Sequence, residues 1–248
     1  MKSVLLTGAA GDIGSTFYKA ARGRYRFVLT DRVQPGFVVG PTDRFEIADL
    51  SVPGAADPLV EAADVIVHLA AESDETKDFH DLLPANVLAA TYLLEAAARA
   101  RVSRFVFASS LHAVHGYPPD HCVRPEEPVR PVNHYGATKC YGEALCACHA
   151  YRDGLSTVVL RIGDFEPCGS GLIADAYDCS AWISPRDIVQ LIIRAIETEG
   201  IGFFIAHGVS DNRIQRLDLA ETRRVLGYQP EDDGFEVFPE AAKRPSPR

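Results

Sequence analysis

Three side chains near the middle of the sequence have the types and spacing that proton transfer needs. Tyr135 and Lys139 lie four residues apart in the run HYGATKCYGE, and on a helix that spacing places them on one face. A phenol has a pKa near 10 and is a poor base at neutral pH, but a neighbouring ammonium group favours the phenolate. YxxxK alone is common by chance. It becomes informative here because Ser110 precedes it, at the end of the apolar run RFVFASS.

A glycine-rich turn near the start of the chain predicts a phosphate-bearing cofactor. The run TGAAGDIG stands between a short apolar strand and a helical pattern, which is the context that such a motif requires. Backbone amides and a helix N-terminus can then approach a pyrophosphate without obstruction by side chains. The residues predicted to contact the cofactor here are Gly8, Gly11, Asp12, Ile13 and Gly14.

The residues that follow the next strands predict how the rest of a dinucleotide is held. Asp31 ends the second apolar run, and a carboxylate there accepts hydrogen bonds from the ribose hydroxyls and repels a 2′-phosphate, which favours NAD over NADP. Arg32 could instead pair with that phosphate, stack on adenine or lie in solvent. Asp49 either meets the adenine edge or caps a loop. The other predicted cofactor contacts are Leu50, Leu69, Ala70, Ala71, Tyr135, Lys139 and Ile162.

The elements that must position these residues alternate between strands and helices. Short runs rich in Val, Ile, Leu and Phe fit strands covered on both faces, at 3–8, 26–31, 44–49, 64–71, 104–110, 156–163 and 202–208. Helical patterns occupy 12–22, about 79–101, 134–152, a segment capped by Ser184, and 216–226. The alternation predicts an α/β fold, a Rossmann-like doubly wound parallel sheet with a small C-terminal substrate-binding region.

Domain boundaries follow from where the alternation breaks down. We expect residues 1–162 to form the dinucleotide-binding core and 163–240 to form a small substrate-binding region interleaved with it. Residues 241–248 end in KRPSPR and are predicted to be disordered.

Composition excludes several classes of partner. The 248 residues are 47% hydrophobic and 24% charged, as in a soluble globular protein, and the net charge is −9. An acidic surface repels nucleic acid and anionic membranes, so neither is an expected partner. No apolar run approaches the roughly 20 residues of a membrane span, and the N-terminal apolar run is too short for a signal peptide. We expect a cytoplasmic protein.

The cysteines predict neither disulfides nor a metal site. Six are present, and in a chain of this length without a secretion signal free thiols are the better interpretation. Cys146, Cys148 and His149 lie close together, but on a helix their side chains point to different faces. No metal is therefore predicted.

With these motifs in hand, the chain resembles the extended short-chain dehydrogenase/reductase family over residues 1–162. The likeness rests on TGAAGDIG, DVIVHLAA, NVLAATYLLEAA, FVFASS, YGATK and LRIG. It implies that Tyr135 is the acid or base, that Lys139 tunes it and holds the ribose, and that Ser110 orients the reacting oxygen. Asn86 corresponds to the asparagine that supports the active site. The family's long helices, here 79–101 and 134–152, often pair between subunits, which implies a homodimer.

The chain departs from the family at one point beside the serine. The family places a glycine five residues after its catalytic serine, whereas Gly116 lies six residues after Ser110. Counting back 25 residues from Tyr135, the usual interval, reaches Ser110, so a one-residue insertion in SSLHAVHG reconciles the two. We assign the role to Ser110 rather than to Ser109.

Within the family, FASSLHAVHGYP, YGATKCYGE and RIGDFEPC…AWIS are similar to segments of the uronate dehydrogenases, which oxidise C1 of a cyclic hexuronic acid with NAD. The resemblance implies that His112 bonds the substrate, and Ser73 could touch the sugar. Alternatively, His112 is a structural histidine whose hydrogen bonds are made within the protein, and Ser73 is a loop serine without a role in binding.

The segment after Ile162 differs from those enzymes where the substrate would bind. They use an arginine to clamp the substrate carboxylate, and counting back from Trp182 places Tyr177 at that position. Asp164 stands where they have a serine. No basic residue lies between Arg161 and Arg186, so a neutral or amino-bearing sugar is a candidate beside a uronate. Alternatively, the acids of this segment face solvent.

Three functions remain open at this stage. The first is an NAD-dependent dehydrogenase that oxidises a sugar or sugar-acid hydroxyl, at C1 of a cyclic uronate or aldose, to a lactone with Tyr135 as base. The second is a nucleotide-sugar epimerase or dehydratase with tightly bound NAD, which generally needs a larger C-terminal region. The third is a non-catalytic dinucleotide sensor, a class that typically lacks the Tyr–Lys pair.

Overall fold

A parallel sheet forms the centre of the molecule. A computed structural model gives the structure of residues 1–167 and 171–245, and within them the main sheet has the strand order β3-β2-β1-β4-β5-β6-β9, with every neighbouring pair parallel. Its strands are β1 (Ser3–Thr7), β2 (Arg26–Asp31), β3 (Arg44–Ile47), β4 (Val65–His68), β5 (Arg104–Ser110), β6 (Thr157–Ile162) and β9 (Phe203–Gly208). The predicted doubly wound fold is confirmed.

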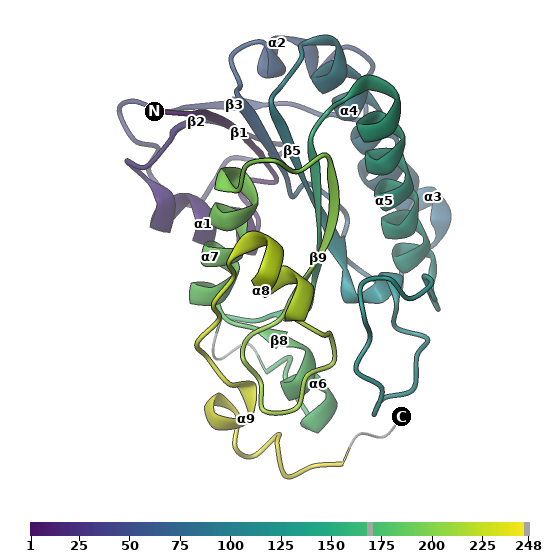
Figure 1. Cartoon of the computed structure of the whole chain (residues 1–248). Helices are drawn as coiled ribbons and strands as arrows, with labels where there is room; N and C mark the ends of the chain where they lie inside the picture. The colour runs from purple at the N-terminus through teal and green to yellow at the C-terminus, as the bar shows by residue number, and fades with distance from the viewer. Residues whose placement is uncertain (168–170, 246–248) are drawn as a thin grey trace.

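Alternate residues of each strand feed two separate cores, one on each face of the sheet. Leu6 packs in one core with Phe17 and Leu191, whereas its neighbour Leu5 packs in the other with Leu93. The first core is covered by α1 (Asp12–Ala21) and α7 (Pro185–Glu197), and the second by α2 (Asp57–Val60), α4 (Ala89–Arg99) and α5 (His134–Asp153). Figure 1 shows these two sets of helices on opposite sides of the strands. Burial on both faces explains why the strands read as continuous apolar runs.

The strand order reverses beside β1, and this reversal fixes where a ligand can bind. The chain runs outward from β1 through β2 to β3 and then returns to the other side of β1 to begin β4. In open α/β sheets, ligands bind outside the carboxyl ends of the strands at such a switch point. The glycine-rich turn, the end of β4 and the end of β5 all lie at that edge.

The long helix predicted over 79–101 contains an irregular turn. It begins as α3 (Phe79–Leu82), continues as the π-helical turn η1 (Leu83–Leu88), and becomes regular again in α4. The remaining helical boundaries agree with the sequence to within a few residues, except that the helix expected over 216–226 is α8 (Ala220–Leu226). Arg216 and Leu217 are instead buried in irregular backbone, where Leu217 bridges to Val123.

The residues after Ile162 both complete the main sheet and build a small subdomain. β7 (Asp164–Phe165) pairs with β8 (Trp182–Ile183), and α6 (Ala176–Ala181) and α9 (Gly234–Val237) lie with β8 in the lower part of Figure 1. The short 3-10 helix η2 (Leu111–Ala113) directly follows β5. Trp182, Cys179 and Phe235 form the core of the subdomain. The predicted disorder of the tail is wrong for 241–245, because Ala241 is buried in this core and Arg244 accepts a backbone hydrogen bond from Ala176. Residues 246–248 lie outside the described residues.

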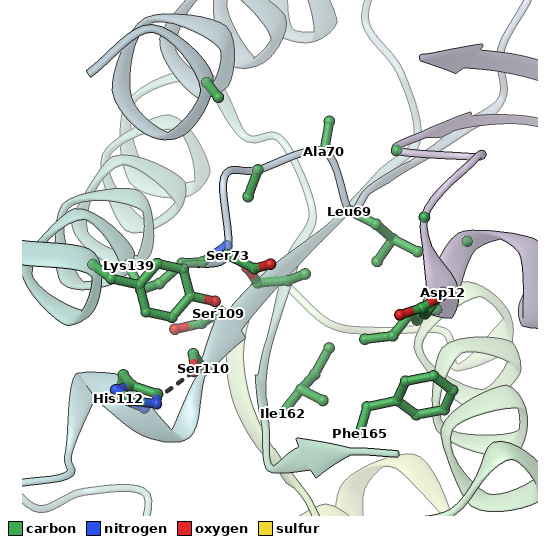
Figure 2. Close-up of a pocket in the computed structure, with 18 of the residues that line it drawn as sticks. Asp12, Leu69, Ala70, Ser73, Ser109, Ser110, His112, Lys139, Ile162 and Phe165 are labelled. Atoms are coloured by element: carbon green, nitrogen blue, oxygen red, sulfur yellow. Dashed lines mark hydrogen bonds between the residues drawn. The ribbon is translucent and has the colours of Figure 1, made fainter. Parts of the chain in front are cut away.

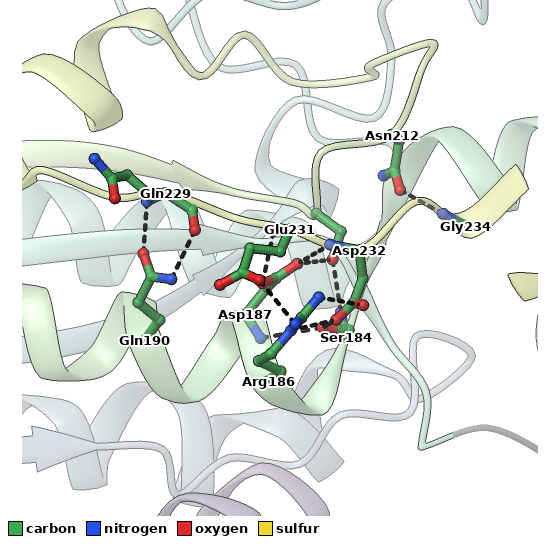
Figure 3. Close-up of polar contacts among 10 residues, drawn as sticks. Ser184, Arg186, Asp187, Gln190, Asn212, Gln229, Glu231, Asp232 and Gly234 are labelled. Carbon is green, nitrogen blue, oxygen red and sulfur yellow. Dashed lines mark hydrogen bonds and ion pairs between the residues drawn. The ribbon is translucent and has the colours of Figure 1, made fainter. Parts of the chain in front are cut away.

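A buried carboxylate fastens the last segment of the subdomain to the start of α7 (Figure 3). Asp187 is fully buried; it accepts hydrogen bonds from Ser210 Oγ at 2.6 Å, from the Glu231 amide at 3.0 Å and from the Asp232 amide at 3.1 Å. Ser184 caps the same helix, as the sequence predicts. The contacts tie residues 229–234 to the strand-covering helix.

Replacing Asp187 with Ala should therefore lower the free energy of unfolding by about 3 kcal/mol, because a buried hydroxyl and two buried amides lose their acceptor. Urea denaturation measures this value. Arg224→Ala is the matched control, since it removes only an exposed pair with Glu221 and should cost less than about 1 kcal/mol. A loss at Asp187 no larger than the control's would show that this carboxylate does not hold the segment.

Candidate active site

A cavity of about 690 Å³ opens along the carboxyl ends of the strands. It runs from the glycine-rich turn, past the ends of β2 and β4, to the segment that follows β6. Figure 2 shows Lys139, Ser110 and His112 toward one end of it and Asp12 toward the other. Its volume lies within the range of small-molecule and cofactor sites.

The glycine-rich turn leaves no room for side chains where a dinucleotide would cross. Gly8 has φ +68°, and a Cβ on it would lie 2.6 Å from the Ala70 nitrogen. A Cβ on Gly14 would lie 2.1 Å from the Gly8 carbonyl oxygen. Gly11 begins α1 without a side-chain cap, so the first amides of the helix keep their donors for a ligand. The turn therefore fits a pyrophosphate.

The end of β2 presents a fixed carboxylate to this cavity. Asp31 Oδ2 accepts a hydrogen bond from the Ala10 amide at 2.9 Å, and Oδ1 accepts one from the Arg32 amide at 2.7 Å. The carboxylate is thereby held between the glycine-rich turn and its own loop. Its position is the one at which an adenosine ribose would be recognised.

Asp49 lines the same part of the cavity while capping its own loop. Its Oδ1 accepts hydrogen bonds from the Ser51 amide at 2.9 Å and from Ser51 Oγ at 2.7 Å, and these bonds lower the pKa of the carboxyl. Asp49 therefore caps its own loop, and it also lies on the cavity wall. All other predicted cofactor contacts also line the cavity: Gly8, Gly11, Asp12, Ile13, Gly14, Asp31, Arg32, Leu50, Leu69, Ala70, Ala71, Tyr135, Lys139 and Ile162.

Ser110, Tyr135 and Lys139 come together at the other end. Ser110 forms a hydrogen bond with the Tyr135 phenol, and Lys139 lies with its Nζ 5.4 Å from the centre of the Tyr135 ring. The ammonium group donates to the Ala108 carbonyl oxygen at 2.9 Å. Ser109 points elsewhere, because its hydroxyl donates to Glu143 at 2.6 Å. Of the two serines, Ser110 is the one in contact with the phenol.

Burial and nearby charges set the pKa values of the phenol and of its neighbouring ammonium group. Burial raises the pKa of Tyr135 to about 12, and the nearby charges of Asp164 and Glu75 raise it further, against the hydrogen bond from Ser110 that lowers it. Burial also lowers the pKa of Lys139 to about 8. The expected lowering of the Tyr135 pKa depends on Lys139 and on the positive nicotinamide ring of a bound cofactor together, and it stays a prediction; in the protein alone, loss of hydration is the largest influence and raises the pKa.

Asn86 supports the site without touching the reacting groups. Its amide oxygen accepts from the Glu72 amide at 2.8 Å, and its Nδ2 donates to Thr138 Oγ1 at 3.0 Å and to the Glu72 carbonyl at 3.0 Å. Asn86 is buried in the π-helical turn η1 and does not line the cavity. These contacts fit the supporting role implied by the resemblance, since Asn86 ties the loop after β4 to α5.

A buried ion pair that the sequence reasoning missed braces the same helix. Arg161 of β6 donates from Nε and Nη2 to the two oxygens of Glu143, each at 2.9 Å. Glu143 lies four residues after Lys139, on the same face of α5. The i, i+4 spacing from Lys139 could have indicated from the sequence that Glu143 faces the site. Its partner Arg161, on β6, can be identified only from the fold. The pair holds α5 against β5 and β6.

The predicted substrate contacts line the cavity beyond the phenol: Ser73, Ser110, His112, Asp164 and Tyr177. His112 is oriented by two neighbours. Asn133 Nδ2 donates to its Nδ1 at 3.1 Å, which leaves Nε2 carrying the proton that faces Glu75 at 2.9 Å. The same Asn133 side chain caps α5 at Gly136. The Asn133 side chain therefore fixes both the first turn of α5 and the orientation of the His112 ring.

Tyr177 has a basic neighbour that a search within its own segment did not find. Arg216 Nε donates to Tyr177 Oη at 3.1 Å, although it is 39 residues away in sequence. Cavity residues to which the sequence assigned no individual contact include Thr30, Glu75, His115, Phe165, Glu166 and Asp178. Phe165 and Glu166 directly follow Asp164, and Glu75 lies two residues after Ser73, so proximity in sequence was an available signal. Cys168, one of the six cysteines predicted to be free thiols, lies outside the described residues.

Comparisons with known proteins agree with this geometry. The model of the NAD dependent epimerase/dehydratase family matches residues 4–171. A uronate dehydrogenase of Pseudomonas putida is 35% identical over 246 residues, covering 98% of this chain and 89% of its own. An L-arabinose 1-dehydrogenase (NAD(P)(+)) of Haloferax volcanii is 30% identical, covering 96% of this chain and 99% of its own. The crystal structure of a uronate dehydrogenase mutant from Agrobacterium tumefaciens complexed with NAD superposes with a TM-score of 0.89 at 31% identity, covering 100% of this chain and 92% of that one.

The chain belongs to the NAD-dependent epimerase/dehydratase family. The resemblance to the uronate dehydrogenases, the dehydrogenase class and the NAD cofactor are confirmed. The preference for NAD over NADP, the homodimer and the cytoplasmic location stay predictions.

Neither a membrane-spanning helix nor a metal-binding cluster is found in the described part of the chain. Across residues 1–167 and 171–245, no helix has the length and apolar character needed to cross a membrane. In the same described part of the chain, no cluster of three or more His, Cys, Asp or Glu side chains could hold a metal ion.

The fixed carboxylate of Asp31 predicts which cofactor is discriminated against. Asp31→Asn keeps an oxygen acceptor for the Ala10 amide but removes the negative charge that repels a 2′-phosphate. The ratio of kcat/KM with NADP to that with NAD should rise at least tenfold, which corresponds to about 1.4 kcal/mol. Initial rates with each cofactor measure it. An unchanged ratio would show that Asp31 does not select the cofactor.

Proposed function

We propose that the protein is an NAD-dependent dehydrogenase that oxidises the C1 hydroxyl of a cyclic sugar to a lactone, with Tyr135 as the base. The observation that carries the proposal is the contact of Ser110 with Tyr135, above Lys139, in a cavity continuous with the glycine-rich turn. Relatives named for uronate and for L-arabinose support a sugar substrate.

The geometry supports a division of roles among three side chains. Tyr135 is 9% exposed and borders the cavity, so its oxygen can reach a hydroxyl group bound there. Ser110 hydrogen bonds to the phenol, and a substrate oxygen held between the two would receive both contacts. Lys139, fixed to the Ala108 carbonyl, keeps a positive charge beneath the ring that favours the phenolate. Tyr135 then takes the proton from the sugar hydroxyl.

The residues at the glycine-rich turn fit NAD, which supplies a hydride acceptor at its nicotinamide ring when bound. Gly8, Gly14 and Asp31 would hold the pyrophosphate and the adenosine ribose. Ile162 and Leu69 line the wall between that end and the phenol. Closure of this apolar stretch around the reacting atoms would limit the entry of water.

The negative charges beside Tyr135 predict the pH dependence of oxidation. A base must be deprotonated to accept a proton, and a raised pKa means that less phenolate is present at neutral pH. The rate should therefore rise as pH increases. Removing one negative neighbour lowers the pKa of Tyr135, so Asp164→Asn and Glu75→Gln should each move this rise toward lower pH.

Profiles of kcat against pH, followed as NADH formation at saturating sugar, test this shift. Tyr135→Phe is the control, and it should lose about a thousandfold in kcat and have no rise to shift. A Tyr135→Phe enzyme with near wild-type kcat would contradict the role of the phenol. A shift toward higher pH in Asp164→Asn would contradict the electrostatic account.

A further inference from the structure

One wall of the substrate end is a continuous row of four rings. The His112 ring lies 5.4 Å from the Tyr135 ring, His115 lies 4.8 Å from His112, and Tyr177 lies 5.7 Å from His115, stacked at 27°. All four residues line the cavity. The row therefore leads along the cavity wall from the proposed base to α6.

Arg216 anchors the far end of this row from behind. Its guanidinium group lies 5.3 Å from the centre of the Tyr177 ring, and the residue is 1% exposed. Its two Nη atoms donate to the backbone carbonyls of Tyr117, Pro118 and His121 at 2.5–2.8 Å. Arg216 does not line the cavity. The guanidinium N–H groups of Arg216 bond to Tyr177 and to the loop behind it. Arg216 is therefore not placed to bind the carboxylate of a ligand in the cavity.

A second part of the cavity wall is acidic. Asp164, Glu166 and Asp178 line it together with Phe165, Leu172 and Ile173, and Glu75 reaches the cavity beside His112. Glu166 accepts hydrogen bonds from the Gly171 and Ile173 amides, each at 2.9 Å, and Asp178 accepts one from the Ala174 amide at 2.9 Å. These two carboxylates shape the wall. Asp164 and Glu75 are near enough to the phenol to act on its charge.

The balance of charge at this end is therefore negative. Among the described residues that line it, four are acids, and Lys139, the one Lys or Arg there, is already placed under Tyr135. A substrate carboxylate or phosphate would be repelled by these acids and would meet no arginine fork. Hydroxyl groups can donate charge-assisted hydrogen bonds to carboxylates, and an ammonium group can also rest over aromatic rings.

We propose that this enzyme selects sugars that carry no anionic group, either neutral aldoses or amino sugars, and that Asp164, Glu75 and Tyr177 set the preference. The proposal rests on the proposed function, since it describes the substrate of that same site. It assigns the ring row to the apolar face of the sugar and the acidic wall to its hydroxyl or amino groups.

Matched sugar pairs test the proposal through binding and turnover together. Glucose, glucosamine, glucuronate and glucose 6-phosphate, and the corresponding galactose set, would be compared by NADH formation and by calorimetric titration of Tyr135→Phe saturated with NADH. We expect kcat/KM and affinity for the best neutral or amino sugar to exceed those of its uronate at least tenfold. A higher value for glucosamine than for glucose would place an amine in the site, and the reverse would place a neutral hydroxyl there; either supports the proposal.

The outcomes separate this proposal from the proposed function. Turnover that favours uronates or sugar phosphates would overturn the charge preference and leave the dehydrogenase intact. Binding that favours uncharged or amino sugars without NADH formation would uphold the preference and overturn the dehydrogenase. Neither binding nor turnover of any neutral or amino sugar would overturn the proposal.

Variants then test the assigned residues. Asp164→Asn and Glu75→Gln should each raise the ratio of uronate to neutral-sugar kcat/KM at least threefold, and together at least tenfold. Asp120→Asn, an exposed acid outside the cavity, is the control and should leave the ratio unchanged. Tyr177→Arg should raise it further. Because that change sets two arginines side by side, Tyr177→Gln provides a second test, in which a loosened wall should weaken neutral-sugar binding. Ratios in both acid variants equal to the control's would overturn the assignment.

Discussion

The position of one buried ammonium group controls the geometry of the whole site. Lys139 reaches across from α5 to the Ala108 carbonyl on β5, and its ammonium group lies over the rings of Phe107 and Tyr135. A buried charge is costly unless it is compensated, so the helix must stay at one height and one rotation against the strand. Tyr135, one turn earlier on the same face, is thereby held over the end of β5 next to Ser110.

Several contacts from distant parts of the chain preserve this geometry. Asn86 braces the helix from η1, the Glu143–Arg161 pair braces it from β6, and Asn133 fixes its first turn together with His112. These contacts fix the position of the base, whereas the cavity residues Asp164 and Glu75 act on its charge.

The sequence was sufficient for what short-range patterns encode. Strands buried on both faces are apolar throughout, Ser184 precedes a proline and an acidic first turn, and the glycine-rich turn stands between a strand and a helix, the context that makes its spacing informative. These local rules placed the sheet, most helices and the cofactor end. They could not place the π-helical turn, because the contacts of Asn86 that accompany it come from the loop after β4 and from α5.

The substrate end was less predictable because its determinants are far apart in sequence. Tyr177 could be aligned with a position expected to be basic, but Arg216 behind it lies in a stretch expected to be helical. The pKa of Tyr135 likewise depends on Asp164 and Glu75, which approach it from two different loops. The burial of Arg216 behind Tyr177 and the burial of Tyr135 both follow from how the chain folds, and local sequence patterns do not encode them. The tail prediction failed for the same reason, since Ala241 is covered by the core of the subdomain.

The most direct test of the central claim follows the hydrogen on C1. With the best sugar substrate deuterated at C1, proton nuclear magnetic resonance of the reduced cofactor should show deuterium at nicotinamide C4, a lactone as the product, and a lowered kcat/KM. Reduced cofactor that carries hydrogen from another carbon, or a sugar that retains its C1 deuterium after turnover, would contradict oxidation at C1.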